Sequence, residues 1–102
     1  LEKTCKNGYM PACNSVGISC GIGQGTKKAK EAKKYYKKSC NNNNMRGCFL
    51  LGGFYDSLYF QTKNKTDKKI ALKSYSKACQ NINTPIEDAC RKYVSLSEYG
   101  NY

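Results

Sequence analysis

The chain has 102 residues, enough for one domain, and 39% of them are hydrophobic, a share that nine tyrosines and seven cysteines raise. A hydrophobic core this small needs additional stabilisation from cross-links. The net charge of +11 predicts an acidic or anionic partner, and the absence of histidine removes the usual proton shuttle of enzymes that work near neutral pH.

Residues 1–22 predict the first of three helical hairpins. Seven residues separate Cys5 from Cys13, with Gly8 to supply a turn and Pro11 suited to the first position of a helix. Only four residues precede Cys5, so most of the first helix of this hairpin is missing. We therefore expect the chain to be a fragment or a processed product.

Residues 26–60 predict a second hairpin. Ala32, Tyr36 and Cys40 recur at intervals of four, which places them on one face of a helix. The four asparagines that follow cannot bury anything and favour a turn, so the next helix must fold back on the first. Cys40 and Cys48 would then lie side by side, and a disulfide between them is geometrically plausible.

Residues 66–100 predict the third hairpin. Ala71, Tyr75 and Cys79 have the same spacing as the corresponding residues of the second hairpin. A wider gap of ten residues separates Cys79 from Cys90. This gap contains the sequence Thr-Pro-Ile-Glu, which predicts a capping box with proline at the first helical position.

The hairpins recur at a nearly fixed period, 35 residues from Cys5 to Cys40 and 39 from Cys40 to Cys79. The longer second period comes from residues 56–66, which predict either a longer loop or an extended helix end. A period of this size with one helical hairpin per repeat is typical of an α-solenoid. The sequence thus predicts an all-α fold, in which each hairpin buries its face against its neighbours.

The repeated pattern is Ala-x3-Tyr-x3-Cys, seven residues, Cys-x3-Gly-x2-Tyr, then Gly-x-Gly and a lysine-rich helix start. It resembles the Sel1-like repeats of the Helicobacter cysteine-rich proteins over nearly the whole chain. The resemblance implies a right-handed superhelix of antiparallel αα-hairpins related to tetratricopeptide repeats, each stapled by one disulfide, in an exported bacterial protein. The implied pairs are Cys5–Cys13, Cys40–Cys48 and Cys79–Cys90. The chain departs from the pattern at Cys20, where a tyrosine is expected, after Tyr55, where Gly-x-Gly is missing, and in the wider third pair.

Seven cysteines in so short a chain indicate an oxidising compartment, so we expect a secreted or periplasmic protein whose leader has been removed. Disulfides are favoured over a metal site because histidine and Cys-x2-Cys are missing, and no cofactor is expected. Cys20 is left over, either as a half-buried thiol in place of a packing tyrosine or as an intermolecular or reactive thiol. No apolar run is long enough to span a membrane.

Lysines cluster on the predicted first helices of the second and third hairpins. In tetratricopeptide-like stacks these helices line the concave side, which predicts a basic groove for an acidic peptide, a partner protein or an anionic cell-envelope polymer. The alternative is a solvated face, because lysine is soluble and favours helices. The residues expected to contact a partner are Lys30, Lys33, Lys34, Lys37, Lys73 and Lys77.

An enzymatic alternative depends on Ser74 and Lys77, which form the Ser-x2-Lys motif of serine β-lactamases and penicillin-binding proteins. A chain this rich in serine and lysine contains about one such match by chance, and neither Ser-Asp-Asn nor Lys-Thr-Gly accompanies it. The family resemblance also implies penicillin binding or weak β-lactamase activity, so action on β-lactams or peptidoglycan is the second hypothesis.

A structural alternative is that the chain is the end fragment of a longer solenoid whose binding surface lies in other repeats. Nucleic-acid binding is a second hypothesis for so basic a chain, since tyrosines are interleaved with lysines. Tyr36 and Tyr75 belong to the predicted packing faces, which leaves mainly Tyr35 free to stack on a base. An exported disulfide protein also seldom meets nucleic acid. The sequence therefore favours a protein interaction module.

Overall fold

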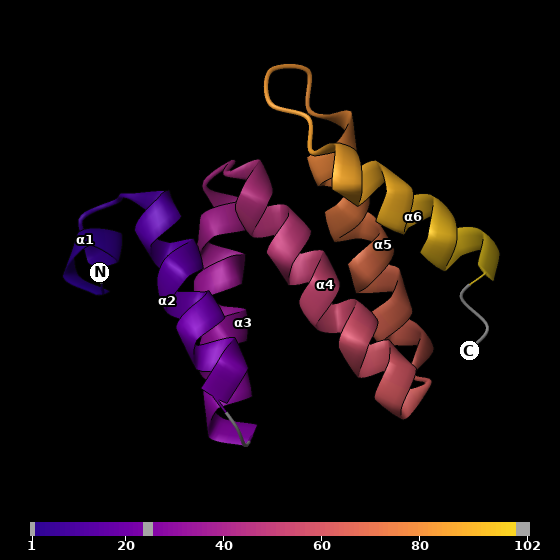
Figure 1. Ribbon diagram of the computed structural model, residues 1–102, viewed down its shortest axis with the longest axis horizontal. Coiled ribbons are helices and arrows are strands. Elements are labelled where there is room, and N and C mark those ends of the chain that lie inside the picture. Colours follow the sequence, from indigo (N-terminus) through magenta and orange to yellow (C-terminus); the bar gives the residue numbers. More distant parts are fainter. Residues whose placement is uncertain (1, 24–25, 100–102) are drawn as a thin grey trace.

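The computed structural model describes the backbone of residues 2–23 and 26–99 and the side chains of residues 3–19 and 30–98. Within these residues the fold consists of six helices without a strand, which confirms the predicted all-α class. Figure 1 shows that successive helices from α2 onward run in alternating directions. The helices are α1 (Glu2–Lys6), α2 (Met10–Gly23), α3 (Thr26–Asn41), α4 (Met45–Thr62), α5 (Lys65–Gln80) and α6 (Glu87–Tyr99).

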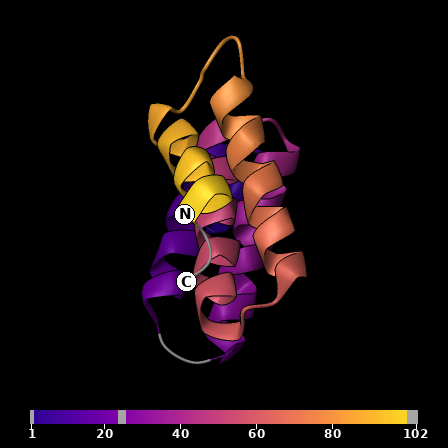
Figure 2. The ribbon, with the colours of Figure 1, turned by 90° about the vertical axis from the view of Figure 1, so that its right-hand side faces the viewer.

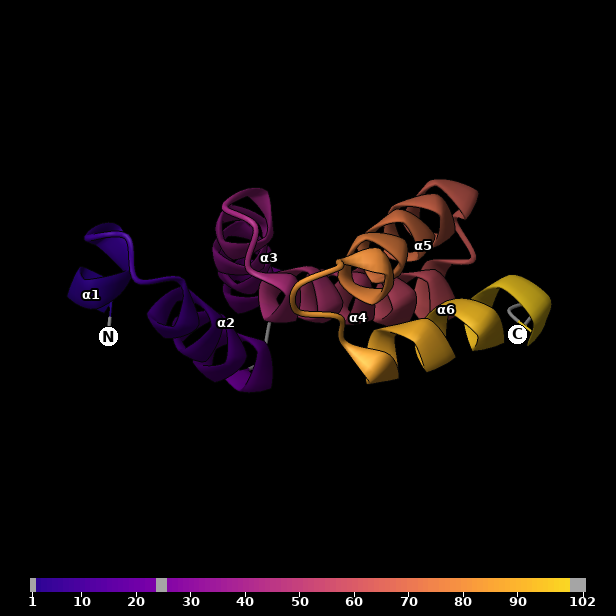
Figure 3. The same ribbon diagram turned by 90° about the horizontal axis from the view of Figure 1, so that it is seen from above.

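The helices form a flat body of 39 × 35 × 17 Å. Figure 3 shows α3 and α5 on one side of this body and α2 and α6 on the other, with α4 between them. Each helix packs against the next one in the chain, and α4 also contacts α2. Figure 2 views the molecule from the α6 end, where α5 and α6 lie side by side. α4 is thus the central helix of the fold.

The connections before and after α4 are short and capped. Asn43 has a left-handed φ of 63°, and Asn44 accepts a hydrogen bond of 3.0 Å from the backbone N–H of Gly47. The predicted asparagine turn is therefore confirmed, and Asn44 also caps α4. At the other end of α4, Lys63 has a φ of 58°, and Asn64 caps α5 by accepting from the backbone N–H two residues on. α4 itself extends to residue 62, so the long second period reflects an extended helix end.

The loop before α6 differs from its prediction. α6 begins at Glu87 rather than at Pro85, and the Ile86 carbonyl accepts the first backbone hydrogen bonds of the helix. The Asn81 side chain accepts from both the N–H and the hydroxyl of Thr84, at 2.7 and 3.2 Å. The predicted capping box is wrong, because the asparagine turn engages the threonine that would have capped the helix.

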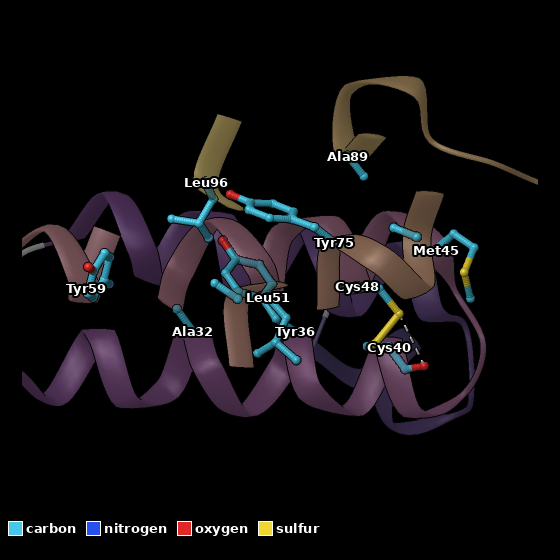
Figure 4. Close-up of a cluster of buried hydrophobic side chains, with 12 residues drawn as sticks. Ala32, Tyr36, Cys40, Met45, Cys48, Leu51, Tyr59, Tyr75, Ala89 and Leu96 are labelled. Atoms are coloured by element: carbon cyan, nitrogen blue, oxygen red, sulfur yellow. Dashed lines mark hydrogen bonds between the residues drawn. A yellow bond between two sulfur atoms is a disulfide. The ribbon is translucent and has the colours of Figure 1, made fainter. Parts of the chain in front are cut away.

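Most buried side chains belong to one cluster that extends from α3 to α6 (Figure 4). Ala32, Tyr36 and Cys40 of α3 and Ala71 and Tyr75 of α5 are all buried in this cluster. Their regular spacing along each helix predicts that they face the same way. The predicted packing faces of the two helices are confirmed for these residues.

Tyr35 lies in a second, smaller cluster with Cys5, Ala12 and Cys13. Its exposed fraction is 8%, so the expectation that Tyr35 is mainly free is wrong. The reason is that α3 packs against α2 as well as against α4, and therefore buries two sides. With Tyr35 buried, the stacking platform suggested for nucleic acid is removed.

At two glycines, a tyrosine ring of the following helix packs directly against the backbone. A Cβ atom at Gly17 of α2 would lie 2.5 Å from Cε1 of Tyr36, and one at Gly52 of α4 would lie 2.6 Å from Cδ1 of Tyr75. Real Cβ atoms do not approach a ring carbon so closely. Each glycine follows a cysteine by four residues, and each allows the next helix to approach with its tyrosine buried.

Three disulfides join successive helices at the loops between them: Cys5–Cys13, Cys40–Cys48 and Cys79–Cys90. Their Cα separations of 4.7, 4.4 and 4.8 Å lie in the usual range for disulfides, and the pairs are the ones that the resemblance implies. All three loops lie at the same end of the molecule, the upper end in Figure 1. The side chain of Cys20 lies outside the described residues, so its state as a free thiol stays a prediction.

Ser39→Ala is expected to raise the free energy of unfolding by about 1 kcal/mol. Ser39 is fully buried, and its hydroxyl has no hydrogen-bond partner among the described residues. The substitution removes this unsatisfied polar group, and α5 carries Ala78 at the corresponding position. Urea unfolding followed by circular dichroism measures the change, with the exposed Ser57→Ala as a control that gains only helix propensity. A less stable Ser39→Ala protein would show that the hydroxyl has a partner after all.

Candidate functional site

Three of the predicted contact lysines share the outer side of α3. Lys30, Lys34 and Lys37 follow one another at intervals of four and three residues, and all three are exposed. Ala32, which is completely buried, marks the opposite side of the helix. Lys33 lies between these two sides and is half-buried, so less of its side chain is accessible to a partner.

The same arrangement occurs on α5. Lys69 and Lys73 are exposed and lie two residues before and after the completely buried Ala71, so both point away from the core. Lys69 was not among the expected contacts, although its interval of four residues from Lys73 would have placed it on the same face. α3 and α5 lie on the same side of the molecule (Figure 3). We call the two sets of lysines together the lysine face: Lys30, Lys34, Lys37, Lys69 and Lys73.

The lysine face keeps its positive charge. Among the described side chains, no acidic residue forms an ion pair with any of its five lysines. By contrast, Arg91 on α6 has two acidic neighbours, Glu87 at 3.3 Å and Asp88 at 3.7 Å. The charges of these five lysines are therefore not neutralised by ion pairs with the described side chains.

Lys77 has a different role from the other lysines. Its Nζ atom donates a hydrogen bond of 3.1 Å to the carbonyl oxygen of Cys40, in the last turn of α3. Carbonyls at the end of a helix lack an intrahelical partner and favour a cation. Lys77 thus links α5 to the end of α3, and its amine is engaged within the protein.

Lys77→Met is expected to lower the free energy of unfolding by about 1 kcal/mol, because the Cys40 carbonyl loses its charged donor. Methionine keeps an unbranched, flexible side chain of similar length and removes the amine. Lys73→Met is the matched control on the same helix, and we expect it to change stability by less than about 0.5 kcal/mol. Thermal and urea unfolding of both variants provide the comparison, and equal effects would contradict the assigned role of Lys77.

The candidate catalytic pair is not arranged for nucleophilic chemistry. Ser74 is only 6% exposed, so its hydroxyl is poorly accessible to a substrate from solution. The amine of Lys77, which would serve as its base, donates instead to the Cys40 carbonyl. A nucleophile needs its base within hydrogen-bonding reach, and the geometry gives no support to this pairing.

A second surface was not predicted. A groove of about 740 Å³ runs along α4, with Ile18 of α2 and Lys92 of α6 among the residues that line it. Its floor includes the apolar side chains of Leu50, Phe54 and Leu58. None of the six expected contact lysines lines this groove. The sequence contained a signal for this groove. Leu50, Phe54 and Leu58 are spaced four residues apart, which places them together on a face of α4 other than the one that carries Cys48.

The described residues hold no cluster of cysteine, aspartate and glutamate that could bind a metal ion. None of the described helices is both long enough and apolar enough to cross a membrane. Comparison of the chain with protein-family models, with curated proteins and with solved structures found no match.

Proposed function

We propose that the protein is an exported interaction module that recognises an acidic peptide, an acidic protein or an anionic cell-envelope polymer through the lysine face. The observation that carries this proposal is the gathering of exposed lysines on α3 and α5 without described acidic partners. An exposed ion pair contributes at most about 1 kcal/mol. Recognition would therefore depend on several lysines that act together, and it would weaken as salt increases.

We further propose that the three helix pairs form a Sel1-like α-solenoid. Two features support this architecture. Each pair contains a disulfide. In addition, Tyr36 packs closely against Gly17, and Tyr75 packs against Gly52 in the same way. A stack of stapled hairpins is rigid, so the lysines would be held at fixed positions before the partner binds. Such preorganisation lowers the entropic cost of binding.

A secreted or periplasmic location belongs to the same proposal. Three intramolecular disulfides in a small protein are typical of an oxidising compartment. In that compartment Cys20 would carry the one thiol left without a partner in the chain, and an intermolecular disulfide through it is a further prediction. Mass spectrometry of a non-reduced digest would decide the state of Cys20.

The lysine face is tested by reversing three of its charges. A variant with Lys30→Glu, Lys34→Glu and Lys37→Glu is expected to bind a polyglutamate peptide at least tenfold more weakly than the wild type. Lipopolysaccharide serves as the second probe, so that an acidic peptide and an anionic polymer can be told apart. Fluorescence anisotropy at several salt concentrations measures both affinities.

The control variant carries the same change of net charge at exposed positions away from the lysine face. Its substitutions are Lys3→Glu, Lys6→Glu and Arg46→Glu. We expect this control to lose less than about threefold in affinity, which corresponds to less than about 0.7 kcal/mol. Equal losses in the two variants would show that only net charge matters and would overturn the proposed site.

A further inference from the structure

None of the residues of the lysine face lines the groove on α4. We infer that it binds a short, extended, mainly apolar peptide segment of a partner protein, with an acidic residue of that peptide toward Lys92. Gly53, the length of the groove and the charge at its edge each support this inference. It does not depend on the proposed role of the lysine face.

The first observation is that the fold does not require a glycine at position 53. Gly53 lies inside α4 and has no left-handed φ, and a Cβ atom built on it would meet nothing nearer than the Tyr75 hydroxyl at 3.8 Å. Glycine inside a helix destabilises it relative to alanine. In contrast to its neighbour Gly52, which receives a tyrosine ring, Gly53 opens the floor of the groove. A glycine at such a place allows another backbone to approach closely.

The length of the groove indicates the length of its occupant. The α4 residues that line it extend from Phe49 to Gln61, which is about 18 Å along a helix axis. An extended segment of about five residues spans this length.

The chemistry of the lining indicates the composition of this peptide. Leu50, Phe54 and Ile18 offer apolar contacts, and alternate side chains of an extended peptide would point toward them. At the edge, Lys92 is exposed and has no acidic partner among the described side chains. Asp56, the acidic residue of the lining, accepts a hydrogen bond of 3.0 Å from the Tyr75 hydroxyl. Lys92 is thus the group that an acidic residue of the peptide would meet.

The test starts from a phage-displayed library of random heptapeptides, selected on the full chain with its disulfides intact. One enriched peptide is then synthesised and its affinity measured by titration calorimetry. We expect the enriched sequences to combine alternating apolar residues with aspartate or glutamate. Failure to enrich any such peptide would overturn the inference.

Gly53→Leu fills the floor of the groove and is expected to weaken binding of the selected peptide at least tenfold. Gly53→Ala is expected to weaken binding more modestly while the melting temperature rises, because alanine favours the helix. Loss of binding with gain of stability separates a blocked groove from a damaged fold. Lys92→Glu is expected to weaken binding a few-fold and to reduce its dependence on salt.

Two controls make the outcome decisive. If Gly53→Leu fails to fold, the exposed Ile18→Asp replaces it as the variant that disrupts the apolar wall. The triple charge reversal at Lys30, Lys34 and Lys37 should lower the affinity for the selected peptide by less than about threefold, the loss expected from net charge alone. Binding that survives the groove variants, or that is abolished by the triple reversal, would place the peptide outside the groove. A requirement for helical peptides would also overturn the inference.

Discussion

Replacing Cys40 and Cys48 together by alanine is expected to lower the free energy of unfolding by about 2–3 kcal/mol. The disulfide closes a loop between residues only eight apart, and the chain-entropy model assigns that amount to a loop of this length. Cys48 is fully buried and Cys40 nearly so, so the loss of packed sulfur adds to the entropic effect. Urea unfolding without reductant, followed by circular dichroism, measures the change.

The Cys79–Cys90 pair provides the comparison, since both of its cysteines are only half-buried. Replacing both of these cysteines by alanine is expected to lower the free energy of unfolding by a similar entropic amount. The contribution from lost packing should be smaller. Reduction of all three disulfides removes a total comparable to the stability of a small domain, which is about 5–15 kcal/mol. A reduced protein that still unfolds cooperatively at the same urea concentration would show that the helices do not need these bonds.

Gly52→Ala is expected to lower the free energy of unfolding by about 2–3 kcal/mol, although alanine is the better helix former. The new methyl group would lie 2.6 Å from Cδ1 of Tyr75. The ring cannot move aside easily, because Tyr75 is 1% exposed, contacts Phe49 at a centroid distance of 6.0 Å and donates its hydroxyl proton to Asp56. The clash therefore separates α5 from α4 or forces the tyrosine out of the core.

The adjacent Gly53→Ala is a close control for this prediction. A Cβ atom at Gly53 has space, so the substitution should raise the free energy of unfolding by up to about 1 kcal/mol through helix propensity alone. Two neighbouring glycine-to-alanine changes in one helix should thus have opposite signs. Thermal unfolding of both variants tests this, and a stabilised Gly52→Ala protein would contradict the tight tyrosine contact.

The sequence predicted those parts of the fold that depend on local patterns. The spacing of Ala32, Tyr36 and Cys40 revealed a helix face, because every fourth residue of a helix returns to nearly the same side. The asparagines before Met45 revealed a turn, because their side chains compete with helical hydrogen bonds and then cap the next helix. Neither inference needed knowledge of distant parts of the chain.

The incorrect or missing predictions concern contacts with distant residues or with a neighbouring loop. Tyr35 was expected to be free because helix periodicity identifies one packing face, whereas α3 also packs on the first disulfide. Lys77 was treated as a surface charge because no local pattern reveals that its amine reaches the Cys40 carbonyl. Thr84 was taken for a cap because the competing side chain of Asn81 could not be weighed from sequence alone. The groove on α4 likewise arises only when residues of all five helices from α2 to α6 come together.

The position of the disulfides makes the two ends of the helix pairs unequal. All three bonds lie at one end, whereas α4 and α5 are joined at the opposite end only by a short capped loop. Thermal fluctuations therefore separate the helices of each disulfide-linked pair first at the end that lacks a disulfide. Backbone amides near residues 60–68 should exchange with deuterium sooner than those beside Cys40 and Cys48. The native protein is thus most easily opened at the end where it is not cross-linked.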